Sequence, residues 1–136
     1  MADAMEKARI VSRIRDEVLS FDDIPAYMKL VCDLCNEDEK IRKQTADDRV
    51  TFQFLIEGGK DFWLKVDAGN FSYGEGKLDA PEMVIGMDER TCAGVFGNRV
   101  NATTAYLNRD MSFQGSLKHG LKFRNIFKSV NKLLGV

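Results

Sequence analysis

The spacing of apolar residues changes twice along this chain. Of all features of the sequence, this change most restricts the folds that the chain can adopt. Between residues 50 and 87, apolar side chains recur at every second position, which is typical of strands with one buried face. Before and after this region they recur every three or four positions, as in amphipathic helices. A chain that groups its strands apart from its helices is predicted to form an α+β fold, with helices over one face of a sheet.

Five segments carry the spacing of strands, four of them consecutive and one later. They lie at residues 50–56, 62–66, 71–73, 83–87 and 111–115. Gly58-Gly59 and Gly69-Asn70 are turn signals between the first three segments, which are expected to pair as an antiparallel meander. We therefore expect a five-stranded, mostly antiparallel sheet that is covered on one face by helices.

The helical spacing predicts an amphipathic helix at residues 4–19, added before the rest of the fold. Asp22 or Asp23 is expected to cap a second helix, with Pro25 in its first turn. Two short helices are expected between the fourth and fifth strands. The long C-terminal helix is expected to bury one apolar stripe, made of Leu117, Leu121, Ile126, Phe127, Val130, Leu133 and Leu134.

The length and composition are those of an ordinary globular chain. With 136 residues, of which 44% are hydrophobic and 30% charged, the chain is long enough to bury a core. We expect residues 1–136 to form one domain, with residues 1–20 as an additional N-terminal helix. The net charge of −1 argues against bulk electrostatic capture of nucleic acid, so no nucleic-acid partner is expected.

Basic residues gather at the C-terminal end of the chain, where residues 117–136 contain no Asp or Glu. They are Lys118, Lys122, Arg124, Lys128 and Lys132. This face predicts transient contact of the C-terminal helix with an anionic membrane surface. The other interpretation is a solvated face opposite a core-facing stripe.

Few residues are of the kinds that catalyse reactions or bind metals. The sole histidine, His119, excludes metal sites built from several histidines. Cys32 and Cys35 follow no strand, unlike typical redox pairs, and are interpreted as buried thiols on a helix. We expect no catalytic residue, no metal and no cofactor. The chain shows neither an apolar signal segment nor the run of about twenty apolar residues that a membrane span needs, so the expected location is the cytoplasm.

Three segments and the helix that follows them share the pattern of a known family. The segments are DFWLKVD at 61–67, APEMVIGMD at 80–88 with a short helix ending at Phe96-Gly97, and AYLNRDMSFQG at 105–115. Together with the terminal amphipathic helix they resemble the sterol carrier protein type two domain. The similarity runs from about Val50 to Leu134.

The resemblance implies a five-stranded sheet with helices on one face, enclosing an apolar tunnel. It further implies non-catalytic binding, and intracellular transfer, of a lipid or another long apolar molecule: a fatty acid, acyl-CoA, phospholipid, sterol or isoprenoid. With the resemblance added, the many aromatic and Met side chains are interpreted as a partly hollow core. The expected lining residues are Phe52, Phe54, Leu64, Met83, Ile85, Met87, Val95, Phe96, Tyr106, Met111, Phe113, Leu121 and Phe127.

Two other hypotheses remain open from the sequence. The first is an interaction or accessory module with a fully packed core and no lipid ligand, in which helix 4–19 binds a partner protein. The second is a thiol-redox or zinc protein that uses Cys32 and Cys35. The volume enclosed by the core separates a lipid carrier from an interaction module, because a packed core leaves no room for a long chain.

Overall fold

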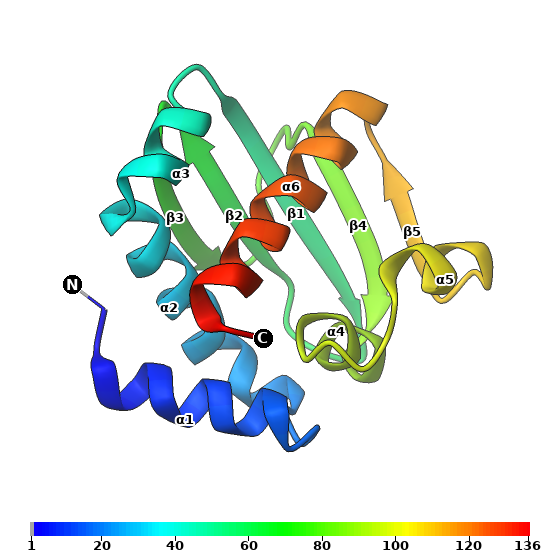
Figure 1. Cartoon of the computed structure of the whole chain (residues 1–136). Helices are drawn as coiled ribbons and strands as arrows, with labels where there is room; N and C mark the ends of the chain where they lie inside the picture. Colours follow the sequence, from blue (N-terminus) through cyan, green and yellow to red (C-terminus); the bar gives the residue numbers. More distant parts are fainter. Residues whose placement is uncertain (1) are drawn as a thin grey trace.

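The structure, a computed structural model that describes residues 2–136, contains five strands. They are β1 Arg49–Glu57, β2 Phe62–Asp67, β3 Asn70–Glu75, β4 Met83–Asp88 and β5 Met111–Gln114. They form one sheet in the order β3-β2-β1-β4-β5 (Figure 1). β1, β2 and β3 pair as the predicted antiparallel meander, and β5 is antiparallel to β4. β4 is parallel to β1, which makes the sheet mixed.

β4 pairs with β1 on the side opposite β2, so the segment between β3 and β4 connects two strands that are not neighbours in the sheet. Side chains of β1 hold this connecting segment in place. Gln53 is 2% exposed, and its side-chain amide donates to the Gly76 carbonyl at 2.9 Å and accepts from the Leu78 N–H at 2.8 Å. Glu82, just before β4, accepts hydrogen bonds from the backbone and side chain of Thr51. A buried glutamine is costly unless its amide is satisfied, and here the crossing segment satisfies it.

Six α-helices and one short 3-10 helix account for the helical segments of the described chain. They are α1 Ala4–Arg15, η1 Phe21–Asp23, α2 Ile24–Glu37, α3 Glu39–Gln44, α4 Glu89–Phe96, α5 Ala102–Leu107 and α6 Leu117–Leu134. Figure 1 shows α2 and α6 in front of the same face of the sheet, with α1 below them. The predicted α+β fold with a helix-covered sheet is confirmed.

The first two connections between helices show details that the sequence prediction lacks. The helix predicted at residues 4–19 ends at Arg15, and Glu17 has a left-handed backbone with φ of 59°. Leu19 is nevertheless buried, because the chain turns back toward the core. The charged stretch after α2 contains α3, and the Asp38 side chain caps this helix by accepting a hydrogen bond from the Ile41 N–H at 2.9 Å.

The apolar stripe predicted for α6 is wrong in its first turns. Leu117 is 79% exposed and Leu121 is 48% exposed. The buried residues of the helix are Phe123, Ile126, Val130 and Leu134. Toward the start of α6, the next position on this buried face of the helix is Gly120, which lies against Met83. A face that is contributed partly by glycine is invisible to a count of apolar residues.

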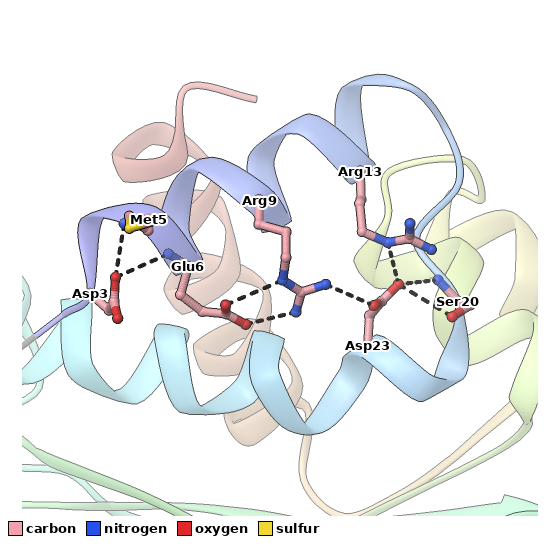
Figure 2. Close-up of polar contacts among 7 residues, drawn as sticks. All are labelled: Asp3, Met5, Glu6, Arg9, Arg13, Ser20 and Asp23. Carbon is pink, nitrogen blue, oxygen red and sulfur yellow. Dashed lines mark hydrogen bonds and ion pairs between the residues drawn. The ribbon is translucent and has the colours of Figure 1, made fainter.

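Figure 2 shows how α1 is attached to the start of α2. The Asp23 carboxylate, 8% exposed as a residue, accepts from Arg13 Nε at 2.7 Å, from an Arg9 guanidinium nitrogen at 3.4 Å and from the Ser20 N–H at 2.9 Å. Burial raises the pKa of the Asp23 carboxyl, but the bonds from Ser20, Arg13 and Arg9 outweigh it and hold that pKa below its usual value. The ionised carboxylate therefore joins α1, Ser20 and α2.

Replacing Asp23 by alanine is expected to lower the free energy of unfolding by about 2 kcal/mol, since charge-assisted hydrogen bonds and a cap are lost. The pKa of Asp23 in the folded state lies below its value of about 3.9 in the unfolded state. The stabilisation by this carboxylate is therefore complete above a pH of about 3.9, and it disappears as the pH falls through the folded pKa. Urea unfolding at several pH values measures it. Asp22→Ala, which removes an exposed neighbour, is the control and should change stability by less than about 0.5 kcal/mol. A difference between Asp23→Ala and the parent chain that persists down to about pH 2 would contradict the ionic origin.

Candidate functional site

The sheet presents one continuous apolar face to the helices. The strand register aligns Phe52 with Leu64 and Met83, and aligns Phe54 with Phe62 and Ile85. Since alternate residues of a strand share a face, the same alignment extends to β3 and β5. The apolar residues of this face are Val50, Phe52, Phe54, Ile56, Phe62, Leu64, Val66, Phe71, Tyr73, Met83, Ile85, Met87, Met111 and Phe113.

Aromatic rings connect this face to the helices above it. Phe54 stacks on Phe62 at 4.6 Å between ring centroids and contacts Phe123 of α6 at 5.9 Å. Phe96 of α4 lies 5.8 Å from Phe54 and 5.2 Å from Phe127. These separations are those of directly packed rings. In the described conformation, the centre of the space between the sheet, α4 and α6 is thus occupied by aromatic side chains.

The structure places the thirteen predicted lining residues at three depths. Eight are buried: Phe52, Phe54, Leu64, Met83, Ile85, Met87, Phe96 and Met111. Three are half-buried: Val95, Phe113 and Phe127. Two are exposed, Tyr106 at 50% and Leu121 at 48%. The set therefore extends from the centre of the core to the surface on the β5 side of the molecule.

The helices leave the β5 edge of the apolar face partly uncovered. Phe113 of β5 is half-buried, and its ring lies 5.4 Å from that of the exposed Tyr106. α5 and the first turns of α6, which precede and follow β5 in the sequence, also carry the exposed side chains of Leu107 and Leu121. Figure 1 shows β5 at one edge of the sheet with α5 near one of its ends. Exposed apolar side chains that continue into a core are typical of a ligand opening or an interaction site.

Two surface hollows lie outside the predicted set. One encloses about 470 Å³ and the other about 430 Å³, and Pro25 and Tyr73 line both. None of the thirteen predicted residues lines either hollow. The turn signal Gly58-Gly59 and the start of α2 were visible in the sequence, but nothing in the sequence indicates that these two segments face each other.

The three cysteines are free, buried thiols. Burial raises the pKa of Cys32, Cys35 and Cys92 to about 12, so the reactive thiolate is scarce at neutral pH. The interpretation of Cys32 and Cys35 as buried thiols on a helix is confirmed. Within residues 2–136, no group of three or more His, Cys, Asp and Glu side chains is arranged to hold a metal ion.

His119 lies in the first turn of α6, where the Ser116 side chain caps its backbone N–H at 3.2 Å. Its Nδ1 is buried and has no hydrogen-bond partner among the described residues. A neighbouring carboxylate, that of Glu82, is occupied by Thr51. No base and nucleophile are therefore paired at this histidine.

The basic residues of α6 separate into a paired residue and an exposed group. Lys122 is half-buried and its Nζ lies 2.9 Å from an Asp48 carboxylate oxygen. Lys118, Arg124, Lys128 and Lys132 are exposed, on the same helix as the exposed Leu117 and Leu121. Among the described residues, no helix has both the length and the apolar character needed to cross a membrane.

The fold is a helix-covered α+β sheet whose covered face is apolar, and comparison with known families identifies it further. A model of the SCP-2 sterol transfer family matches residues 29–128, and the chain belongs to this family. The family resemblance stated from the sequence is thereby confirmed. The match begins within α2, so α1 lies outside it. No significant match was found among curated protein sequences.

Solved structures show the same fold at low sequence identity. The sterol carrier protein domain 2 of Helicoverpa armigera is 14% identical with a TM-score of 0.59, covering 76% of this chain and 84% of that one. A conserved hypothetical protein of Thermus thermophilus is 17% identical with a TM-score of 0.57, covering 80% and 84%. The inverting sec-alkylsulfatase Pisa1 of Pseudomonas sp. is 14% identical with a TM-score of 0.60, but the match covers 76% of this chain and only 15% of the sulfatase.

Proposed function

We propose that this chain, residues 1–136 acting as one domain, binds a lipid without catalysing a reaction on it. The ligand lies between the apolar sheet face and α4, α5 and α6, and the thirteen predicted residues line it. The observation that carries the proposal is the apolar face that runs from the buried core to the half-buried Phe113 at the β5 edge. Membership of a sterol transfer family supports it.

Partition of apolar surface supplies the binding energy in this proposal. Each Å² of ligand removed from water contributes about 25 cal/mol, so a long chain needs no specific polar contact. The rings in the centre must then move aside, and the Met side chains of β4 and β5 are flexible enough to repack around different chains. Exposed Tyr106 and Leu121 lie at the mouth, where the polar end of the lipid remains in water.

Native mass spectrometry of freshly purified protein, followed by organic extraction, tests the proposal. The expected result is a co-purifying lipid at near-stoichiometric amounts, which also identifies its class. A clean unliganded mass, together with no uptake of an added fluorescent lipid, would overturn the proposal. The packed aromatic centre would in that case favour an interaction module.

We further propose that α6 contacts anionic membrane surfaces when the lipid is exchanged. Exposed Leu117 and Leu121 insert among the lipids, while exposed Lys118, Arg124 and Lys128 meet the headgroups. On α6, exposed apolar side chains lie beside exposed basic ones. A helix face that contacts only water does not need these apolar side chains.

The double variant Lys118→Glu/Lys128→Glu is expected to bind phosphatidylserine-containing vesicles at least about ten-fold more weakly, since each basic residue near such a surface contributes about 1 kcal/mol. Vesicle co-sedimentation measures this change. Lys40→Glu/Lys65→Glu alters the same number of charges on exposed residues elsewhere and should leave binding nearly unchanged. Equal loss in both double variants would contradict a specific role for α6.

A further inference from the structure

The two surface hollows adjoin each other and are together named here the α2–β3 groove. The first is bounded by the start of α2, the turn between β1 and β2, the end of β3 and Glu89 at the start of α4. The second continues along α2 to Cys32 and Asp33. They join at Pro25 and Tyr73, which line both. Their volumes of about 470 and 430 Å³ lie in the range of small-molecule sites.

The groove has an apolar and aromatic wall. Its accessible side chains are Phe21 of η1, Pro25 of α2 and Tyr73 of β3. Ile24 and Phe62, which are 1% and 2% exposed, lie behind them. The rings of Phe62 and Tyr73 lie 6.0 Å apart at an angle of 55°. Aromatic faces attract cations as well as alkyl chains, because the face of the ring is electron-rich.

Charged side chains around this wall are mostly acidic. Carboxylates of Asp22, Asp33, Asp61, Glu75 and Glu89 line the groove, against the ammonium groups of Lys29 and Lys60. Asp61 lies 3.8 Å from Lys77, and Glu75 lies 3.8 Å from Lys60. The other three acids, Asp22, Asp33 and Glu89, have no ion-pair partner in the described part of the chain.

We propose that the α2–β3 groove is a second ligand site, which takes an amphiphile with a cationic head, such as an alkylammonium. The chain of the ligand packs on Phe21 and Pro25, and its ammonium group lies near Tyr73 and the unpaired carboxylates. The same carboxylates repel the carboxylate, phosphate or sulfate head of an anionic lipid. The residues that line the groove include none of those proposed to line the lipid site.

Calorimetric titration with dodecyltrimethylammonium and dodecyl sulfate, both below the concentrations at which they form micelles, tests this site. The chains are matched, so a difference between them reports on the head. The cation is expected to bind and the sulfate to bind at least about ten-fold more weakly, with the difference shrinking as salt screens the exposed charges. Circular dichroism in the same titration confirms that the protein stays folded.

Two variants locate the binding. Asp22→Lys/Glu89→Lys is expected to weaken binding of the cation by at least about ten-fold. Asp47→Lys/Asp110→Lys makes the same change in net charge at exposed positions outside the groove and is expected to leave it nearly unchanged. Equal binding of the two amphiphiles, no binding of the cation, or equal loss in both variants would overturn the proposal. Binding of the cation that survives unchanged in Asp22→Lys/Glu89→Lys would belong to the lipid site, which is judged separately by the co-purifying lipid.

Discussion

Phe54→Ala is expected to lower the free energy of unfolding by about 4 kcal/mol. Phe54 is fully buried at the centre of the sheet, where its ring packs directly on Phe62, Phe96 and Phe123. Removing the ring deletes the apolar surface it buries and leaves a cavity that the surrounding strands cannot close, because β1 is paired on both sides. A loss of this size lowers the melting temperature by more than about 10 °C.

Leu55→Ala is the matched control, since Leu55 is the next residue of β1, points to the opposite face and is 37% exposed. Thermal and urea unfolding of both variants measure the difference. A loss below about 1 kcal/mol for Phe54→Ala would show that the rings do not fill the interior, and that the space between sheet and helices is open in solution. In the proposed lipid site, added lipid should partly restore the stability of Phe54→Ala by binding the folded state.

Phe113→Glu is expected to weaken lipid binding by at least about ten-fold while leaving the fold intact. The residue is half-buried on the apolar face at the β5 edge, so a carboxylate there can reach water in the unliganded protein. A lipid that covers it must strip that water away, and an unpaired buried charge costs well over the roughly 1.4 kcal/mol that corresponds to a factor of ten. Titration with a fluorescent neutral lipid measures the change in affinity, because the new carboxylate does not repel an uncharged lipid.

Leu55→Glu provides the control, because it adds the same charge to a strand on the opposite face of the sheet. It should bind the neutral lipid as the parent chain does, and circular dichroism should show both variants folded. Equal affinity of Phe113→Glu and the parent chain would move the ligand away from the β5 edge. The lining set predicted from the sequence would then be wrong at its outer end.

The strand pattern shows how far local spacing predicts this fold. Every segment with apolar residues at alternate positions became a strand, because one face of the sheet is buried and any shift by one residue would expose it. The glycine turns then left only an antiparallel meander for the first three strands. The parallel pairing of β4 with β1 carries no comparable signal, since it depends on where the segment between β3 and β4 crosses and on its bonds to Gln53.

The predictions that differ from the structure share a different cause. Spacing alone included Leu117 and Leu121 in the buried face of α6, whereas the tertiary fit brings Gly120 against Met83 and turns both leucines outward. The α2–β3 groove was likewise not foreseen, because Phe62 and Tyr73 look like ordinary core residues until Phe21 and Pro25 approach them from another part of the chain.

By itself, the sequence determined the α+β class, the five strands and the apolar face, because these follow from the period of hydrophobic residues along short segments. It also determined that Cys32 and Cys35 lie on a buried helix face. Only the tertiary structure decided the strand order, the attachment of α1 through Asp23 and the places where the apolar face reaches the surface. The physical reason is that each of these depends on contacts between residues far apart in the chain, which no local pattern records.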